Sequence, residues 1–315
     1  MGFRHDITRI ISYLPKERQT LLFSATLPKE LSKMTELAMR KDYSYINTIE
    51  EGEENTNVQV TQEYIVTPLC DQIASLENIL KCHQKERAAT GYKIMVFFNT
   101  ARTTGYLSRV FQHAEYNVLE MHSRKSQGFR TKTAKSFTEQ KNVIMFSSDV
   151  SARGVDYPGV TLIVQVGLTS KEQYIHRLGR TGRAGKEGKG ILLLSEFEKT
   201  FLTELHDLKI TKLENFDMTA STETQTVLDY VVKSPSLLKE AGLAYQAFLG
   251  FYNGESKKLG MSKQTLIEIA NEYSTILGCV EQPSIGANIV GKMGLKGQSG
   301  LRITKGKSSP RNIHK

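Results

Sequence analysis

Residues 176–183 read His176-Arg177-Leu178-Gly179-Arg180-Thr181-Gly182-Arg183. Arginine recurs at every third position of this run, and Gly179 and Gly182 directly precede Arg180 and Arg183. Each glycine would cost an ordinary amphipathic helix about 1 kcal/mol, so a solvated basic helix surface explains the pattern poorly. Guanidinium groups beside glycines can approach phosphate oxygens closely and bind them with paired N–H donors. The run therefore predicts a phosphate-binding site.

Short apolar segments alternate with helical stretches on both sides of this run. The expected strands lie at residues 58–66, 94–98, 118–121, 143–146, 162–166 and 191–194, and the expected helices at 71–87, 103–113, 127–138 and 171–178. Strands that are apolar throughout and joined by helices indicate a parallel sheet covered on both faces. We therefore expect an α/β domain over residues 58–208, with its ligands at the carboxyl ends of the strands.

The two ends of the chain follow other patterns. Helical stretches at residues 6–13 and 29–39 flank one apolar strand pattern at 20–24. One strand and two helices cannot bury their own apolar faces, so residues 1–48 are expected to be the remnant of another domain, joined by an acidic linker at 49–57. Downstream, helical patterns at 222–232, 236–251 and 262–273 indicate a mainly α-helical extension over 209–283. Residues 284–315, rich in Gly, Ser and Lys, are expected to form a basic, flexible tail.

Charge and composition narrow the class of protein. The chain has 39% hydrophobic and 24% charged residues, as in ordinary globular proteins. Its longest apolar runs are strand-length, well short of the ~20 residues that span a bilayer, so no membrane contact is expected. Residues 292–315 hold seven basic and no acidic residues out of a net charge of +9, which leaves +2 for everything upstream. A basic end favours a nucleic acid partner about as well as a merely solvated tail.

The arginine-rich run resembles motif VI of DEAD-box proteins, a subgroup of superfamily 2 RNA helicases. That resemblance implies that Arg180 and Arg183 are arginine fingers on the γ-phosphate of ATP. It also implies that His176 and Arg177 help to couple two RecA-like domains. Arginine fingers contribute about 10³–10⁵-fold to the rate of phosphoryl transfer.

Residues 148–156, which follow the strand at 143–146, resemble motif V of the same family. The resemblance implies that Asp156, together with Gly154, contacts the bound nucleotide and that Arg153 braces the interface between the two domains. Ser148 stands where the family usually has Thr and keeps the hydroxyl that would bond an RNA phosphate, and Asp149 follows it.

Weaker motifs occur in the family's order. Residues 96–100 resemble motif IV, and Gln127 with Arg130 resembles the Gln-x-x-Arg motif that grips the RNA backbone. Between them, the usual His-Gly pair is replaced by His122-Ser123. By this resemblance the RNA-binding residues are Asn99, Thr100, Gln127, Arg130, Ser148 and Asp149. The segment Ser24-Ala25-Thr26 resembles motif III, which links ATP hydrolysis to RNA unwinding.

The resemblance implies a C-terminal RecA-like domain whose ATP-binding half is missing. Gly286 to Lys292 has P-loop spacing, but Met293 stands where the Mg²⁺-binding Ser or Thr should be. ATP with Mg²⁺ would then be held mainly by an upstream RecA-like domain, and RNA would be bound through its backbone. We expect an ATP-dependent RNA helicase or RNA chaperone that is inactive as this chain alone. A non-catalytic RNA-binding module is the alternative.

The helical extension and basic tail resemble mitochondrial DEAD-box RNA chaperones that remodel introns in fungi, and some plant DEAD-box proteins. This resemblance favours mitochondria, although nucleus and cytoplasm stay open. The three cysteines, Cys70, Cys82 and Cys279, show neither disulfide nor metal-ligand spacing. A reducing compartment is therefore expected, with no bound metal from this chain.

Overall fold

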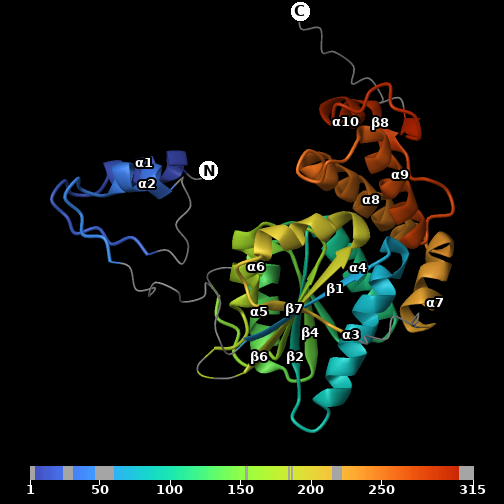
Figure 1. Cartoon of the computed structure of the whole chain (residues 1–315), viewed down its shortest axis with the longest axis horizontal. Helices are drawn as coiled ribbons and strands as arrows, with labels where there is room; N and C mark the ends of the chain where they lie inside the picture. Colours follow the sequence, from blue (N-terminus) through green and yellow to red (C-terminus); the bar gives the residue numbers. More distant parts are fainter. Residues whose placement is uncertain are drawn as a thin grey trace, which may run out of the picture. The chain divides into compact units, whose positions relative to one another are not determined.

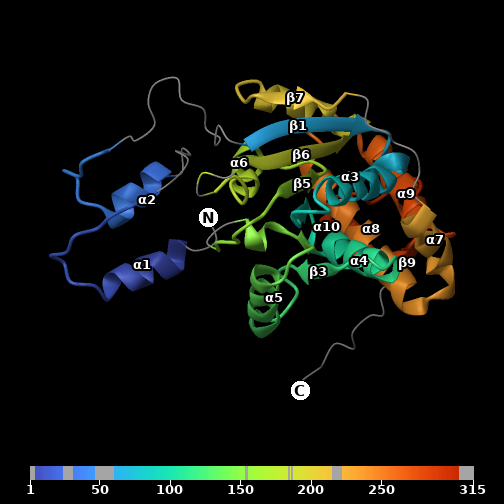
Figure 2. The same cartoon turned by 90° about the horizontal axis from the view of Figure 1, so that it is seen from below.

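The computed structural model describes residues 4–23, 31–46, 60–152, 155–183, 185, 187–214 and 222–304, without the side chains of residues 31–34 and 222. The chain divides into two compact units, Met1–Glu53 and Glu54–Lys315, which are described separately. Figures 1 and 2 show the elements of each unit in two perpendicular views.

The first unit contains two helices, α1 (Arg4–Ser12) and α2 (Leu31–Ala38). The strand predicted at residues 20–24 is wrong over its described part, since residues 20–23 form neither helix nor strand and the Phe23 side chain is 86% exposed. A strand needs a hydrogen-bonded neighbour, and the described part of this unit offers none. Its assignment to another RecA-like domain stays a prediction, and the acidic linker at 49–57 lies outside the described residues.

The second unit is built on a parallel sheet of seven strands in the order β3-β4-β2-β5-β6-β1-β7. The strands are β1 (Val60–Thr67), β2 (Lys93–Phe98), β3 (Val118–Met121), β4 (Val143–Ser147), β5 (Leu162–Val166), β6 (Gly188–Ser195) and β7 (Ile210–Lys212). The expected RecA-like α/β fold is confirmed. The short edge strand β7 was not predicted, because three residues with one half-buried side chain carry too little pattern.

Helices cover both faces of this sheet, with α3 (Gln72–Glu86) and α4 (Ala101–His113) on one side and α5 (Gln127–Glu139) and α6 (Lys171–Leu178) on the other (Figure 2). Alternate residues of β2 divide between the two layers. Val96 and Phe98 belong to the same apolar cluster as Leu76 and Leu107, whereas Phe97 packs in the layer of α5. Because all seven strands are parallel, their carboxyl ends lie together at one edge of the sheet.

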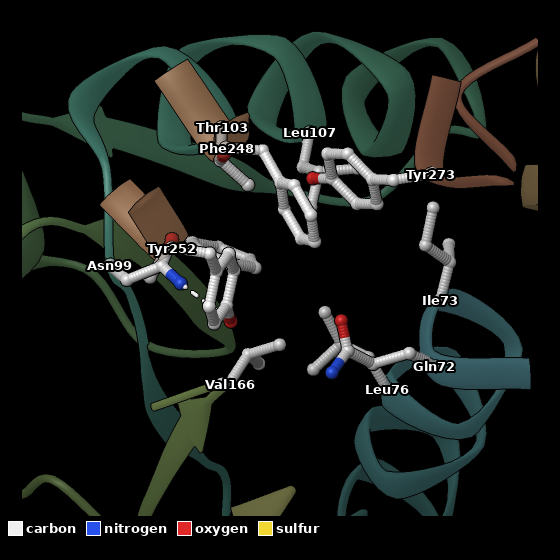
Figure 3. A pocket seen from close by; sticks show the side chains of 12 residues that line it. Gln72, Ile73, Leu76, Asn99, Thr103, Leu107, Val166, Phe248, Tyr252 and Tyr273 are labelled. Carbon is white, nitrogen blue, oxygen red and sulfur yellow. Dashed lines mark hydrogen bonds between the residues drawn. The ribbon is translucent and has the colours of Figure 1, made fainter. Parts of the chain in front are cut away.

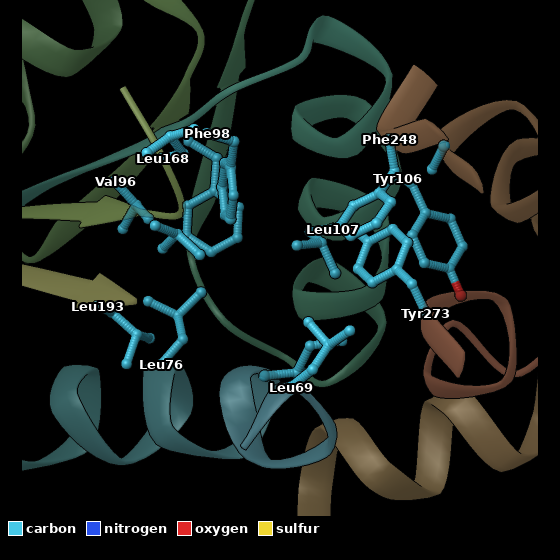
Figure 4. Close-up of a cluster of buried hydrophobic side chains, with 14 of the residues drawn as sticks. Leu69, Leu76, Val96, Phe98, Tyr106, Leu107, Leu168, Leu193, Phe248 and Tyr273 are labelled. Carbon is cyan, nitrogen blue, oxygen red and sulfur yellow. The ribbon is translucent and has the colours of Figure 1, made fainter. Parts of the chain in front are cut away.

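A helical extension follows the sheet, formed by α7 (Thr222–Tyr230), α8 (Pro235–Glu255), α9 (Lys263–Ile276) and α10 (Ala287–Lys292). Phe248 and Tyr273 stack with ring centroids 4.0 Å apart and pack beside Leu107 of α4 (Figure 4). The Tyr106 hydroxyl donates to the carbonyl of Leu277 at 2.5 Å. The expected helical extension is thus present, and its core is continuous with that of the sheet domain.

A buried carboxylate fixes the start of α7. The Glu77 side chain of α3 has no solvent exposure and accepts hydrogen bonds from the Thr224 backbone N–H at 3.2 Å and from the Thr224 hydroxyl. It also accepts from the Tyr116 hydroxyl at 2.8 Å. An acceptor at a helix N-terminus satisfies an amide that the helix itself leaves unpaired.

The flexible tail expected from residue 284 does not hold for residues 284–304. Strand β8 (Ile285–Gly286) pairs in parallel with β9 (Ile303–Thr304), and α10 lies between them. Three apolar side chains spaced five residues apart, Ile285, Val290 and Leu295, are at most 1% exposed. A spacing of five residues matches neither a helix nor a strand, so the sequence pattern of this Gly- and Lys-rich stretch did not indicate that these side chains are buried. Residues 305–315 lie outside the described chain.

His83 of α3 is a buried histidine with a defined proton arrangement. Its Nε2 lies 2.8 Å from the Thr161 hydroxyl, which itself donates to the Lys93 carbonyl at 3.0 Å. Nε2 therefore carries the proton, and the buried Nδ1 has no hydrogen-bond partner among the described residues. Burial, followed by repulsion from Arg87 and Lys189, lowers the pKa of His83 from 6.5 to about 4.

We expect His83 to make stability fall as the pH falls. Between pH 6.5 and 4 the unfolded chain binds a proton at this histidine and the folded chain does not, so acid favours unfolding. Relative to His83→Gln, which keeps the N–H donor but cannot titrate, the wild type should lose about 2 kcal/mol of unfolding free energy between pH 7 and pH 5. Urea unfolding at both pH values measures this difference, and equal losses in the two proteins would contradict it.

Candidate nucleotide and RNA site

The turn after α6 presents the predicted arginine fingers. Helix α6 ends at Leu178, and Gly182 takes a positive φ of 67° that turns the chain back toward β6. The Thr181 hydroxyl donates to the Val160 carbonyl at 2.6 Å. A Cβ at Gly188 would lie 2.6 Å from that hydroxyl, so β6 begins directly against the turn. Gly182 and Gly188 are therefore needed for the turn itself and for its close packing against β6.

Arg180 is half-buried with part of its guanidinium unsatisfied. One terminal nitrogen, Nη1, donates to the Val155 carbonyl, while the buried Nε has no partner among the described residues. Burial, followed by repulsion from Arg183, lowers the pKa of Arg180. A cation that is desolvated, repelled by a neighbour and short of acceptors would be stabilised by a bound anion.

Arg183 pairs with Asp156, the residue predicted to contact the nucleotide. Its Nε also donates to the Gly179 carbonyl at 2.8 Å. The Asp156 side chain is 71% exposed, and an ion pair so open to water contributes only about 0–1 kcal/mol. Both partners can therefore be redirected to a ligand at small cost.

The arginine turn lines a surface pocket together with residues that were not predicted. The charged and aromatic side chains at this pocket are those of Arg87, Tyr157, Arg180, Arg183 and Glu187. Arg87 follows α3 and shares no motif with the others, so nothing in the sequence pattern pointed to it. The structure thus brings Asp156, Arg180 and Arg183 together, while Gly154 and Arg153 lie outside the described residues.

Arg177 points into the domain instead of toward this pocket. Its side chain is 1% exposed, donates from Nε to Asp149 at 2.7 Å and lies 5.4 Å from the centre of the Phe97 ring. Asp149 follows β4 and was predicted to bind RNA. Arg177 therefore connects the arginine turn to the loop at the carboxyl end of β4. His176 lies 3.4 Å from Glu172, one turn earlier on α6.

The remaining predicted RNA residues lie after β2 and β4 and at the start of α5. Ser148 is 8% exposed and donates its backbone N–H to the Met121 carbonyl at 3.1 Å. Gln127 is exposed, and the buried Nε of Arg130 has no partner among the described residues. Thr100 caps α4 by accepting from the Thr103 backbone N–H at 3.0 Å. Ser24, Ala25 and Thr26 lie outside the described residues.

The His122-Ser123 pair replaces a usual His-Gly, and the structure shows how the loop is held. His122 Nε2 lies 2.6 Å from Glu120, which also pairs with Lys125 at 2.7 Å. Burial alone would raise the pKa of Glu120, but its bonds to His122 and Lys125 lower it. Ser123 is exposed, so its side chain does not disturb this packing.

Asn99 is tied to two side chains that sequence reasoning missed. Its Nδ2 donates to the Tyr252 hydroxyl at 3.0 Å, and that hydroxyl donates to Glu198. Glu198 follows Ser195 by three residues and forms a capping box with it, a pattern visible in the sequence. Tyr252 sits in α8 with no local signal of its position.

Comparison with known proteins assigns the fold and the turn to one family. Residues 71–185 match the helicase conserved C-terminal domain. DEAD-box ATP-dependent RNA helicase 31 of Oryza sativa subsp. japonica is 47% identical over 96% of this chain and 54% of its own length. DEAD-box ATP-dependent RNA helicase 31 of Arabidopsis thaliana is 46% identical over 96% of this chain and 42% of its own length. The chain thus spans about half the length of the curated relatives it matches.

Two solved structures of a DEAD-box helicase have the same fold as this chain. Mss116p bound to ssRNA and AMP-PNP superimposes with a TM-score of 0.80 at 27% identity, covering 96% of this chain and 63% of that one. The Mss116p DEAD-box helicase domain 2 bound to an RNA duplex gives a TM-score of 0.63 at 27% identity, covering 78% of this chain and 98% of that one. The chain therefore carries the C-terminal RecA-like domain of the DEAD-box family, continued by a helical extension.

Proposed function

We propose that this chain is the second half of an ATP-dependent RNA helicase and supplies its arginine fingers and half of its RNA-binding surface. One observation carries the proposal: Arg180, Arg183 and Asp156 meet beside one pocket, with a buried guanidinium nitrogen of Arg180 lacking an acceptor. The names of the relatives, which are ATP-dependent RNA helicases, support it.

In this proposal ATP would be held mainly by a first RecA-like domain, together with a Mg²⁺ ion that would neutralise phosphate charge there. Domain closure brings Arg180 and Arg183 to the γ-phosphate, where they stabilise the charge on its oxygens during transfer. Asp156, released from Arg183, turns to the nucleotide's ribose, with Gly154 beside it. His176, Arg153 and the segment Ser24-Ala25-Thr26 couple the two domains.

The RNA surface in this proposal lies at the carboxyl ends of β2 and β4 and at the first turn of α5. Arg130 and Ser148 bind phosphates, with Gln127 and Thr100 beside them. Contacts of this kind position the strand without reading its bases, so recognition is largely independent of sequence. The ion pair of Arg177 with Asp149 connects this RNA surface to the turn that carries Arg180 and Arg183.

We also propose a reducing compartment inside the cell. Cys70, Cys82 and Cys279 are all free thiols. A mitochondrial location is supported only by the resemblance of the extension to mitochondrial RNA chaperones. In the part of the chain that the structure describes, every helix is too short or too polar to cross a bilayer.

The arginine fingers can be tested by reconstitution. We expect no RNA-stimulated ATP hydrolysis from this chain alone, and turnover when the segment that precedes the matched region of the rice relative is fused before it. Arg180→Ala should then lower kcat by about 10³-fold or more, because charge on the transferring phosphoryl group goes unstabilised. Arg302→Ala, which removes an exposed arginine paired with Glu281, serves as the matched control.

Two results would contradict this: turnover by the unfused chain, or an Arg180→Ala fusion as active as the control. RNA binding by the fusion without any turnover would favour the non-catalytic RNA-binding module instead.

The basic end beyond Thr304 can be tested separately. Truncation after Thr304 keeps β9 and the buried Leu295 but removes four basic residues, Lys305, Lys307, Arg311 and Lys315. If these bind phosphates, RNA affinity should fall, and the slope of log affinity against log salt should flatten by ~0.7 for each lost contact. Fluorescence anisotropy across a salt series measures both. Ser308→Ala with Ser309→Ala is the control, and an unchanged slope after truncation would show a merely solvated end.

A further inference from the structure

Three polar side chains from distant parts of the sequence meet behind the loop after β2. Asn99 comes from the end of β2, Glu198 from the turn after β6, and Tyr252 from α8 in the extension. Figure 3 shows Asn99 and Tyr252 facing each other across the edge of a small cavity, joined by their hydrogen bond. Tyr252 is 2% exposed and Glu198 is fully buried.

Glu198 is surrounded by donors. Its Oε1 accepts from the Leu168 backbone N–H at 2.6 Å and from the Tyr252 hydroxyl, and its Oε2 accepts from the Ser195 backbone N–H at 2.7 Å. Each of its two oxygens accepts from a backbone N–H, the arrangement of an ionised carboxylate, while burial raises the pKa of Glu198 to about 6. A carboxylate has no proton to give, so each of these bonds runs toward it.

This fixes the direction of the whole chain of hydrogen bonds. Burial and the neighbouring Glu198 raise the pKa of Tyr252 well above its ordinary value, so the phenol keeps its single proton. That proton is donated to Glu198. Toward Asn99 the Tyr252 oxygen can then only accept, and the partner must be the Nδ2 amide group. A flipped amide would set two acceptor oxygens against each other.

The position of Asn99 is enforced by packing as well. Gly167, at the end of β5, has a positive φ of 82°, and a Cβ built there would lie 3.1 Å from the Tyr252 hydroxyl. The same Cβ would lie 3.2 Å from both Asn99 Nδ2 and Glu198 Oε1. The three polar groups thus converge on a space that only a glycine leaves open.

With Nδ2 held inward, the acceptor Oδ1 on the other arm of the amide is left for a ligand. Phosphate oxygens of a nucleic acid only accept hydrogen bonds and cannot satisfy it. Along a sugar-phosphate backbone the 2′-hydroxyl of RNA is the donor, and DNA lacks it. The polarity of the buried network therefore selects the chemistry of the group that Oδ1 of Asn99 can bind.

We propose that Tyr252, held by Glu198, is a positioning residue that turns the Asn99 amide oxygen toward an RNA 2′-hydroxyl. The inference rests on the proposed RNA-binding function of the loop after β2. It gives the extension a part in RNA-over-DNA discrimination without any contact between Tyr252 and the nucleic acid.

The test is Tyr252→Phe, which removes the hydroxyl and frees the amide to flip. Fluorescence anisotropy with labelled oligouridine RNA should show about fivefold weaker binding, the equivalent of one hydrogen bond, while binding of the matching oligodeoxyuridine changes little. Tyr245→Phe is the matched control, because it removes another buried α8 hydroxyl that bonds Asn271 and Gln282 and does not touch Asn99. It should bind RNA as the wild type does.

A double-mutant cycle separates positioning from general destabilisation. If Tyr252 acts through Asn99, adding Tyr252→Phe to Asn99→Ala should cause no further loss of RNA affinity. Additive losses would overturn the inference. A thermal unfolding curve of each variant shows whether its fold is intact.

A second measurement does not require the Tyr252 variant to fold. RNA carrying 2′-fluorine cannot donate to Asn99, so the wild type should prefer the hydroxyl form, and Asn99→Ala should lose about fivefold of that preference. An equal preference in both proteins would overturn the inference while leaving RNA binding itself in place. If the wild-type chain binds no RNA at all, the proposed function of this surface fails, and the inference fails with it.

Discussion

A parallel sheet that is apolar on both faces must be covered on both faces, and the architecture of this chain follows from that constraint. Helices α5 and α6 cover one face, and α3 and α4 cover the other. Helix α4 also has Tyr106 and Leu107 beside the extension, so that layer needs a further covering. The extension supplies it through Phe248 and Tyr273. The second unit is therefore sheet, helices and a second helical layer with one continuous core.

The same layering places the proposed RNA-binding and nucleotide-binding residues in two separate regions of the domain. Loops at the carboxyl ends of β2 and β4 carry the residues assigned to RNA, whereas α6 runs back across the sheet and delivers its arginines beside Asp156. The ion pair of the buried Arg177 with the partly exposed Asp149 connects one set to the other. Breaking it would leave the charge of the buried Arg177 uncompensated, so the two surfaces are expected to keep a fixed relation within this domain.

Much of this arrangement could be predicted from the sequence because its signals are local. Continuous apolar runs located five of the seven strands, the alternation over residues 58–66 located β1, and the Arg-Gly run located the turn where Arg180 and Arg183 stand with Asp156. What escaped prediction depends on contacts between distant residues. Tyr252 bonds Asn99 although 153 positions separate them in the sequence. Arg87 lines the same pocket as Arg180 and Arg183 only because the folded chain brings the end of α3 beside them. The buried Ile285, Val290 and Leu295 were hidden because glycines and lysines separate them. The strand expected at residues 20–24 has no neighbouring strand to pair with over its described part, residues 20–23.

The carboxylate of Glu77 has a consequence for motion. By accepting the Thr224 amide, it joins α3 to the first helix of the extension at a point that is closed to water. Together with the Tyr106 bond to Leu277 and the aromatic stack against α4, it gives the extension several separate points of attachment. Any rotation of the sheet domain must therefore move α8, α9 and α10 with it as one rigid unit. A small angular change at the turn that carries Arg180 and Arg183 would become a larger displacement at the far end of the extension.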